Sequence, residues 1–329
     1  MEFSGFVNES IGRVEEEMRQ VLSAEPRCVY GLLDEYIFRG GKRIRPALLM
    51  LSFGALDGKD KKNAVKASAL IELFHNFTLI HDDVEDDSHF RRGKPTLHIS
   101  HGIPIALNSG DALYTLVWNR FLELDMPLEK RVKIASISGR AFQRVVEGQG
   151  VELEWYRTGK TSVSEDEYFS MVLGKTGALM GASCEAGAYL AGADSGTVEK
   201  FRMFGESLGV AFQIQDDILN VTGDFEKYKK EIGGDITEGK RSLMFIHAMS
   251  HATPGERKKL SSMLLSRTRD RKKIDYVVSA FRKYDSINYA RLRALRFVEE
   301  ASAFLRELRP SRESGELTDL AQHVIKREF

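Results

Sequence analysis

The sequence is poor in cysteine: Cys28 and Cys184 are the two cysteines among 329 residues, and they lie far apart. Such a pair provides neither a disulfide framework nor a metal-ligand spacing, and it suits a reducing compartment. No run of about 18 apolar residues occurs, so no membrane span is expected. The N-terminal stretch contains acidic residues and lacks the apolar core of a signal peptide. We therefore expect a cytoplasmic protein without stable membrane insertion.

An excess of charge of one sign is also missing. Lysine and arginine total 48, as do aspartate and glutamate, so the formal net charge is zero. The sequence thus has no global positive field of the kind that attracts nucleic acid, and no nucleic-acid partner is expected. Hydrophobic residues make up 42% of the chain and charged residues 29%, which excludes a mainly disordered protein and indicates a globular one.

Prolines are few, seven in all, and most lie where periodic segments begin or end. Between them, apolar residues recur every three or four positions, and sustained period-two alternation does not occur. The sequence therefore predicts an almost entirely α-helical protein. We expect helices over residues 4–22, 27–38, 44–56, 61–87, 103–125, 127–150, 164–192, 196–222, 240–250, 256–265, 270–282, 286–308 and 315–327.

An acidic cluster, HDDVEDD, occupies residues 81–87 and follows an apolar helical stretch. Asp82 and Asp86 are four residues apart, so their carboxylates lie one above the other on one face of a helix, and Asp83 flanks them. Like charges at this spacing repel each other, and a divalent cation is the natural compensation. An acidic run by itself is more often a solvated helix face. The apolar residues before this run favour a cation-binding site instead.

A second acidic cluster, QDDILN, lies at residues 215–220, again after apolar residues. Asp216 and Asp217 are adjacent, and Asn220 follows Asp216 by four positions. Oxygen ligands suit a hard ion such as Mg²⁺, which prefers one or two carboxylates together with waters and phosphate oxygens. Two such clusters facing each other across a helical bundle would hold a diphosphate through bridging Mg²⁺.

Basic segments supply the positive charge that a diphosphate also needs. In GGKRIRP, Lys42 and Arg45 lie at a probable helix start, where backbone N–H groups attract anions as well. The segment GKT is not a P-loop, because the glycine required at position 169 is a phenylalanine. Each segment alone would more often be a surface pair, but together with two acidic clusters they indicate two diphosphate sites. The four segments are residues 40–46, 91–93, 174–176 and 239–241.

Five motifs occur together and in order: GGKRIRP, DDxxDxxxxRRG, GKT, FQIQDD and GGDxxxGKR, between residues 40 and 241. In this the chain closely resembles the trans-isoprenyl diphosphate synthase (polyprenyl synthetase) family. The segments HNFTLIHDDVEDD and FQIQDDILN look most like those of archaeal short-chain members. The resemblance implies a single all-α domain over residues 1–329, a helical bundle around a central cavity, and usually a homodimer.

The resemblance also implies roles for individual residues. Asp82, Asp83 and Asp86 would bind Mg²⁺ on the allylic diphosphate, and Asp216 and Asp217 would hold a further ion, giving two or three Mg²⁺ per active site. The residues implied to contact the allylic diphosphate are Arg91, Lys175, Lys230 and Lys240. Those implied to bind isopentenyl diphosphate are Lys42, Arg45, His75 and Arg92. Those implied to line the path of the carbocation are Thr176 and Gln213.

One position departs from the family pattern, because Asn220 stands where many members have aspartate. An amide oxygen still ligates or hydrogen-bonds Mg²⁺, so whether Asn220 binds metal is left open. The polar stretch 223–239 is either a solvated loop or a lid that excludes water from the carbocation. The remaining histidines, such as His81 and His98, are expected to be structural or surface residues.

The expected reaction is ionisation of an allylic diphosphate (dimethylallyl, geranyl or farnesyl), condensation with isopentenyl diphosphate, and loss of a proton. Helix geometry places Thr78 and Phe74 in a row about 6 and 12 Å below Asp82, with Phe77 beside it. In the family, an aromatic residue five positions before the first motif is associated with products of about twenty carbons, and Phe77 has that place. Tyr114 is expected to narrow the pocket from a neighbouring helix. We expect mainly geranylgeranyl diphosphate with some farnesyl diphosphate, although each aromatic residue could simply pack in the core.

Several alternatives stay open on sequence alone. A terpene cyclase of the same fold would share an aspartate cluster but would not need Lys42, Arg45 and Arg92 for a second diphosphate. A farnesyl or a 25-carbon product is also compatible with the motifs. A non-catalytic subunit and a charged helical scaffold are the two non-enzymatic alternatives.

Overall fold

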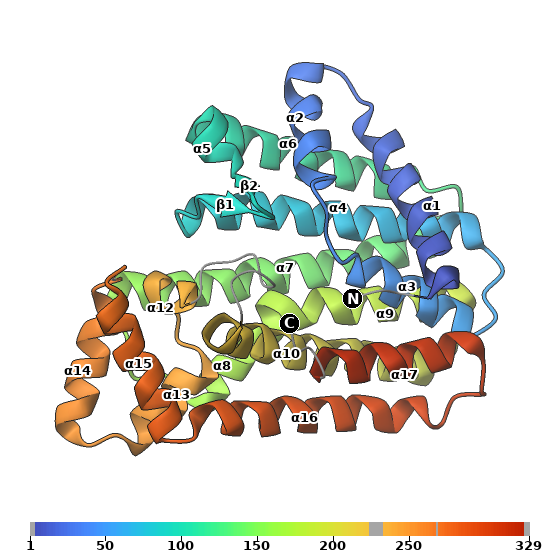
Figure 1. The fold of residues 1–329 in the computed structure, drawn as a ribbon. Coiled ribbons are helices and arrows are strands. Elements are labelled where there is room, and N and C mark those ends of the chain that lie inside the picture. The colour runs from blue at the N-terminus through green and yellow to red at the C-terminus, as the bar shows by residue number, and fades with distance from the viewer. Residues whose placement is uncertain (1–3, 224–232, 268, 326–329) are drawn as a thin grey trace. The chain divides into compact units, whose positions relative to one another are not determined.

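The computed structural model describes residues 4–223, 233–267 and 269–325, and nearly all of its ordered elements are helices (Figure 1). The single sheet in these residues is a two-stranded antiparallel hairpin that pairs Phe90 with Pro95 and Arg91 with Lys94. The elements are α1 (Gly5–Leu22), α2 (Arg27–Ile37), α3 (Ile44–Ala55), α4 (Lys61–Glu85), β1 (Phe90–Arg91), β2 (Lys94–Pro95), α5 (Leu97–His101), α6 (Ile103–Leu122), α7 (Leu128–Thr158), α8 (Glu165–Val172), the π-helix η1 (Leu173–Gly177), α9 (Ala178–Ala191), α10 (Ser195–Thr222), α12 (Gly234–Glu238), α13 (Leu243–His251), α14 (Pro254–Leu265), α15 (Arg271–Lys283), α16 (Ser286–Leu305) and α17 (Arg312–Ile325).

Side-chain caps explain where several helices begin. Ser164 and Glu167 form a reciprocal capping box at the start of α8, and Thr253 and Glu256 form another at the start of α14. Asp60 accepts a hydrogen bond from the backbone N–H of Asn63 at the start of α4. Each cap satisfies N–H groups that have no partner within the first turn of a helix.

The residues form two compact units. Unit 1 comprises residues 1–142, 179–205 and 304–319, and unit 2 comprises residues 143–178, 206–303 and 320–329. Helices α7, α10, α16 and α17 therefore contribute residues to both units. The expectation of one domain over residues 1–329 stays a prediction.

Helix α4 is the centre of unit 1. It packs against α1, α3 and α6, and most of its side chains between Asn63 and Asn76 are buried. A helix that is apolar on most of its circumference has to be surrounded by other elements. This burial places the polar C-terminal end of α4, with the first acidic cluster, at the edge of a rigid core.

Unit 2 is built around shorter helices. Helix α15 packs against α12, α13 and α14, and α8 packs against α13. Phe245 of α13 and Phe281 of α15 are each 1% exposed, and Phe169 of α8 lies edge-on to Phe297 of α16. These contacts hold the segment around Lys240, which joins α12 to α13, against the rest of the unit.

The prediction of an all-α protein is confirmed, and most helix ends agree with the expected ranges within three residues. Helix α7 continues eight residues beyond the expected end at 150, and the expected helix 164–192 is interrupted by η1. The hairpin, α5 and α12 were not expected, because each spans too few residues for a periodic signal. Within the residues described, no helix combines the length and the apolar character needed to cross a membrane.

Candidate functional site

The first acidic cluster lies where α4 ends. The backbone N–H of Asp86 donates to the carbonyl of Asp82 at 2.8 Å, so the two aspartates are one helical turn apart, as expected. Both side chains are partly exposed. Their carboxylates are therefore in reach of a ligand from solvent.

Asp83 differs from its two neighbours, because it is only 1% exposed. One of its oxygens accepts a hydrogen bond from the Tyr36 hydroxyl at 2.6 Å, and the other accepts from Nε of Arg91 at 2.8 Å and from Nη2 as well. Burial and the nearby Asp83 carboxylate raise the pKa of Tyr36. Burial disfavours the charged form of Arg91, but Asp83 and its neighbours outweigh this effect and raise the pKa of that guanidinium. Asp83, Tyr36 and Arg91 thus form a closed, charge-balanced group.

Three of the residues expected to bind isopentenyl diphosphate gather beside this group. His75, on α4, has a pKa well below its usual value because of burial and of repulsion by four arginines, Arg45 and Arg92 among them. The histidine is therefore neutral at pH 7. The Nε of Arg45 is buried and has no hydrogen-bond partner in the part of the chain that the structure describes. Lys42, by contrast, is exposed at the end of its loop.

Arg43, which the sequence argument did not single out, is the structural anchor of this segment. It is 4% exposed and binds Glu15 at 2.8 Å, Glu72 at 3.3 Å and the Ile37 carbonyl at 3.0 Å. These contacts fix the start of α3, which carries Arg45. Its only sequence signal was its place between Lys42 and Arg45.

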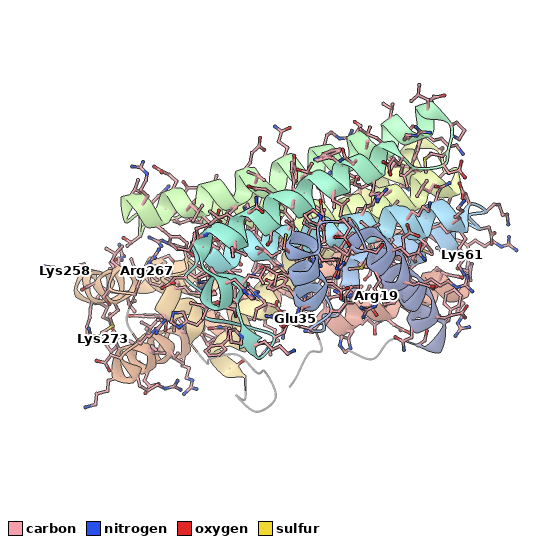
Figure 2. All side chains as sticks on the ribbon, turned by 90° about the horizontal axis from the view of Figure 1, so that it is seen from above. Arg19, Glu35, Lys61, Lys258, Arg267 and Lys273 are labelled. Atoms are coloured by element: carbon pink, nitrogen blue, oxygen red, sulfur yellow. The ribbon has the colours of Figure 1, made fainter. Side chains whose placement is uncertain are left out.

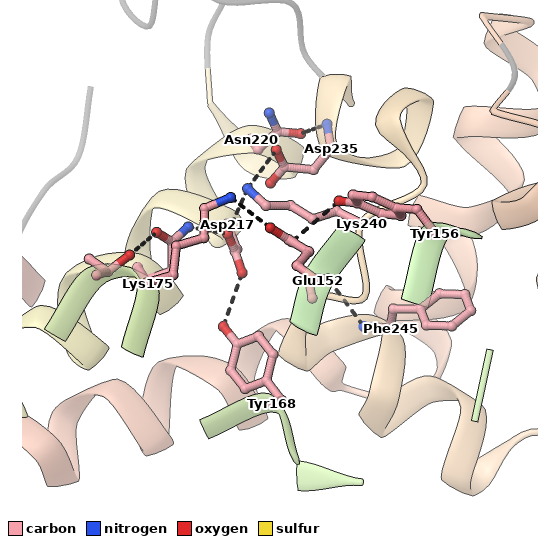
Figure 3. Close-up of polar contacts among 12 residues, drawn as sticks. Glu152, Tyr156, Tyr168, Lys175, Asp217, Asn220, Asp235, Lys240 and Phe245 are labelled. Carbon is pink, nitrogen blue, oxygen red and sulfur yellow. Dashed lines mark hydrogen bonds and ion pairs between the residues drawn. The ribbon is translucent and has the colours of Figure 1, made fainter. Parts of the chain in front are cut away.

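The two aspartates of the second acidic cluster, on α10 in unit 2, also differ in burial, and Figure 3 shows the contacts of Asp217. Asp216 is partly exposed, whereas Asp217 is 3% exposed. The Asp217 carboxylate accepts hydrogen bonds from the Tyr168 hydroxyl at 3.0 Å and from Nε2 of Gln213 at 2.8 Å. Burial raises the pKa of Asp217 to about 7, against the attraction of Lys240.

Lys240 completes this group. Its Nζ lies 3.7 Å from Asp217 and 3.4 Å from Asp235. Burial disfavours the charged amine, but Asp235 and Asp217 outweigh it and raise the pKa of Lys240. The side-chain oxygen of Asn220 accepts the backbone N–H of Asp235 at 3.1 Å, so this oxygen holds the start of α12 in place. Lys230, also expected here, lies outside the described residues.

The GKT segment forms the π-helix η1, a local widening of the helix that is frequent at functional sites. Lys175 Nζ lies 2.6 Å from Glu152 of α7 (Figure 3), and Thr176 donates a hydrogen bond to Oε1 of Gln213 at 3.1 Å. Burial disfavours the Glu152 carboxylate, but Lys175 and Lys240 outweigh it and lower its pKa. Glu152 was missed from sequence, because it belongs to no motif.

The residues of unit 2 enclose a small pocket of about 30 Å³. This volume accommodates one or two groups the size of a water molecule. The side chains that line it include both lysines and the polar residues expected near the carbocation, namely Glu152, Tyr168, Lys175, Thr176, Gln213, Asp217 and Lys240. The pocket thus brings together five residues that the sequence predicted for the site, namely Lys175, Thr176, Gln213, Asp217 and Lys240. The partly exposed Asp216 belongs to the same unit but does not line the pocket.

The residues expected to limit product length lie in an aromatic cluster of unit 1. Phe74 is fully buried and stacks on Phe142 with ring centroids 3.3 Å apart. Phe77 is partly exposed and lies 5.2 Å from the ring of Tyr114, which is 39% exposed. Thr78 is also partly exposed and donates to the carbonyl of His75 at 2.8 Å. Phe74 is thus a core residue, and Phe77 and Tyr114 border accessible space.

The carboxylates of both clusters are candidate ligands of Mg²⁺. Among the residues that the structure describes, no three His, Cys, Asp or Glu side chains form a group that could hold a metal ion. Mg²⁺ is usually held by one or two carboxylates together with substrate phosphates and waters. Asp82 and Asp86, partly exposed and one turn apart, fit this pattern, and so does Asp216. The oxygens of Asp83 and Asp217 are engaged in hydrogen bonds.

Comparisons with known proteins show the family of this chain. Residues 26–281 match the sequence profile of a family described as polyprenyl synthetase. A geranylgeranyl diphosphate synthase from Saccharolobus solfataricus is 33% identical, over 99% of this chain and 98% of its own. A short chain isoprenyl diphosphate synthase from Methanothermobacter thermautotrophicus is 34% identical over 95% of each chain. The crystal structure of a geranylgeranyl pyrophosphate synthetase from Pyrococcus horikoshii Ot3 superposes with a TM-score of 0.91, at 31% identity over 98% and 97% of the two chains.

The contact between α7 and η1 depends on two glycines and generates a prediction. A Cβ on Gly148 would lie 2.4 Å from the backbone nitrogen of Lys175, and one on Gly174 would lie 2.9 Å from the carbonyl of Arg144. We expect Gly148→Ala to displace Lys175 from Glu152, to lower the free energy of unfolding by about 1–3 kcal/mol and to lower activity. Urea denaturation and a steady-state assay measure the two effects.

Gly150→Ala is the matched control, because nothing lies within 4 Å of a Cβ at that helical position. It should leave activity unchanged and raise the free energy of unfolding by about 0–1 kcal/mol through helix propensity. Equal behaviour of the two variants would contradict the close approach at Gly148.

Proposed function

The chain belongs to the polyprenyl synthetase family of prenyltransferases, which generally depend on Mg²⁺, and we propose that it condenses isopentenyl diphosphate with allylic diphosphates. Dimethylallyl, geranyl and farnesyl diphosphates are the proposed acceptors, and geranylgeranyl diphosphate is the proposed main product, with some farnesyl diphosphate. One observation carries the proposal: in each unit, a partly exposed aspartate is the sequence neighbour of a buried one that pairs with a cation, Arg91 in unit 1 and Lys240 in unit 2. Such an arrangement suits a ligand made of diphosphate and a hard metal ion.

We propose that two or three Mg²⁺ ions take part, with Asp82, Asp86 and Asp216 as direct ligands. Asp83 and Asp217, expected from sequence to share this role, accept hydrogen bonds from tyrosines, which supports a role in orienting the ligating side chains. Bound Mg²⁺ would supply positive charge that stabilises the departing diphosphate.

The cations divide between the two substrates in this proposal. Arg91, Lys175 and Lys240 contact the allylic diphosphate, and so does Lys230, which lies outside the described residues. Each of the first three lies within 4 Å of a buried acid, which holds its side chain in position. The residues proposed to bind isopentenyl diphosphate are Lys42, Arg45, His75 and Arg92. The neutral state of His75 lets it act as a hydrogen-bonding partner without adding to the repulsion among the arginines.

The chemistry follows from these positions. The allylic C–O bond breaks and releases diphosphate, the alkene of isopentenyl diphosphate forms a new C–C bond with the carbocation, and a proton is lost to the released diphosphate. Thr176 and Gln213, joined by a hydrogen bond of 3.1 Å, border the pocket of unit 2 with oxygen dipoles that stabilise the transient positive charge. No protein base is required.

The reaction is tested with radiolabelled isopentenyl diphosphate, each allylic starter in turn, and Mg²⁺. We expect label in products of fifteen and twenty carbons, with twenty dominant, only when both substrates are present. A terpene cyclase would instead convert the allylic substrate to hydrocarbon without isopentenyl diphosphate. That result would contradict the proposal, and inactivity of the purified chain would favour a non-catalytic subunit or scaffold.

The role of the partly exposed carboxylates is tested by Asp82→Asn. Loss of a ligand charge weakens metal binding and stabilisation of the leaving group, so we expect kcat/KM to fall by at least about 100-fold, with a higher Mg²⁺ requirement. Asp87→Asn is the matched control, because Asp87 is a neighbouring exposed acid outside the proposed ligand set. It should change kcat/KM by less than about threefold, the scale of a surface substitution. Similar losses in both variants would remove Asp82 from the site.

Product length is tested at Phe77, which is partly exposed and lies between Phe74 and Tyr114. Replacing it with alanine removes the proposed floor of the pocket, so we expect products longer than twenty carbons on chromatography. Phe121→Leu is the control, because Phe121 belongs to the same cluster but contacts Trp118 and Phe142 instead. Unchanged products from Phe77→Ala would assign the floor to another residue, and a farnesyl or 25-carbon main product of the native chain would correct the proposed length.

A homodimer is the proposed assembly, and unit 1 offers a face for it. Ile103, Leu107 and Tyr114 of α6 are 53%, 37% and 39% exposed. Their spacing of four and seven residues places them on one stripe of the helix. Exposed apolar stripes of this kind mark protein–protein contacts. A second copy of the chain is the proposed occupant, and a cytoplasmic location stays part of the proposal.

Light scattering after size exclusion tests this assembly. We expect the native chain to have the mass of a dimer and Leu107→Glu to shift it to the monomer, because a charge would be buried without a partner. Met203→Glu changes another exposed apolar residue, 55% exposed on α10, and should remain dimeric. A monomeric native chain would overturn the proposed dimer.

A further inference from the structure

Helices α14 and α15 of unit 2 carry an unusual concentration of positive charge. Residues 254–283 contain ten lysines and arginines and three acids, a net charge of +7, in a chain whose total is zero. The other 299 residues therefore carry −7. All ten basic side chains are exposed: Arg257, Lys258, Lys259, Arg267, Arg269, Arg271, Lys272, Lys273, Arg282 and Lys283. Figure 2 shows Lys258, Arg267 and Lys273 at this end of unit 2.

The three acids of residues 254–283 offset only part of the charge of the ten basic residues. Glu256 pairs with Lys283 at 2.5 Å, and Asp275 pairs with Arg271 at 3.4 Å. Lys259 and Arg267 lie over the rings of Tyr276 and Tyr156, at 3.7 and 4.8 Å from the ring centroids. A tyrosine ring stabilises a cation without cancelling its charge. The ten basic residues, which we call the basic hairpin surface, thus present a strong positive field to solvent.

We propose that the basic hairpin surface docks the enzyme on an anionic lipid bilayer. Leu265, the last residue of α14, is 50% exposed and is followed by Arg267 and Arg269. An exposed apolar side chain among basic ones suits the boundary between headgroups and acyl chains. Exposed lysines and arginines are attracted to anionic lipids over about a Debye length.

A membrane surface fits these residues better than nucleic acid does. Proteins that bind single strands stack bases on exposed aromatic rings, and proteins that bind duplexes add polar side chains that read base edges. Here lysine and arginine already cover the rings of Tyr276 and Tyr156. The inference also rests in part on the proposed function, because a twenty-carbon diphosphate is an amphiphile that partitions into bilayers.

The surface adjoins the proposed site within unit 2. Helix α12, whose Asp235 pairs with Lys240, packs against both α14 and α15. Arg241, the residue after Lys240, contacts the same Tyr156 ring as Arg267, at 5.0 Å. A bilayer at the basic hairpin surface would thus be next to the segment that carries the GKR motif.

Vesicle flotation without substrate tests the proposal independently of catalysis. We expect the full chain to float with vesicles of 70% phosphatidylcholine and 30% phosphatidylglycerol, and at least tenfold less with phosphatidylcholine alone. Binding should fall as salt rises from about 0.05 to 0.5 M, because the attraction is screened. Equal binding to the two vesicle types, or binding to neither, would overturn the proposal.

The variant Lys258→Glu/Lys272→Glu/Lys273→Glu should lower flotation at least tenfold while prenyl transfer with soluble substrates stays unchanged. The matched control is Lys59→Glu/Lys61→Glu/Lys62→Glu, which makes the same charge change at exposed lysines of unit 1. Equal loss in both triple variants would show that binding depends on net charge alone and would contradict a specific surface.

Tighter binding to a 30-nucleotide RNA than to the anionic vesicles would assign the surface to nucleic acid instead. Loss of prenyl transfer in the native chain would refute the proposed function and leave the flotation result standing.

Discussion

Two buried carboxylates, Asp83 and Asp217, hold the rest of the candidate site in position. A charged group that has lost its water is costly unless hydrogen bonds and an opposite charge replace that water. Each of these aspartates therefore binds a tyrosine hydroxyl and lies beside a cation, Arg91 in unit 1 and Lys240 in unit 2. Because the cations come from segments outside the aspartate helices, these contacts also fix the hairpin after α4 and the segment after α12.

The same contacts set the direction of the neighbouring aspartates. Successive residues of a helix are about 100° apart around its axis. When Asp83 or Asp217 points into the protein, Asp82 or Asp216 is turned toward a different side and keeps contact with solvent. One acid of each pair is thus enclosed by the protein, and the other keeps partial contact with solvent. In each unit the buried aspartate is held by a tyrosine and a cation from other segments of the chain, so the division follows from the surroundings of each acid.

The cationic side chains of the two units differ in how their charge is compensated. In unit 2, Lys175 and Lys240 each have a buried acid nearby, so their positions are fixed by ion pairs. In unit 1, burial and repulsion by several nearby arginines lower the pKa of His75, and the buried Nε of Arg45 has no partner in the described chain. A cluster of like charges is stabilised by an anionic ligand. The basic hairpin surface shows the same imbalance at the exterior, although the chain as a whole is neutral.

Local patterns predicted much of this protein. Apolar periodicity located the helices, because each long helix repeats its burial pattern over several turns. The motifs identified the family and indicated the candidate site residues. The partners Tyr36 and Tyr168 were not predictable, since they lie 47 and 49 residues from the aspartates that they bind. The π-helix at Lys175 and the short hairpin also escaped prediction, because tertiary contacts at Gly148 and around Arg91 stabilise them.

The sequence by itself determined the helical class, the family and the oxygen-rich and cationic chemistry of the site. Only the tertiary structure decided which aspartate of each pair is buried and which cations are matched by acids. The physical reason is that adjacent aspartates have the same chemistry and the same helix propensity. What distinguishes them is the set of atoms that the folded chain places around each one, and residues distant in sequence provide those atoms.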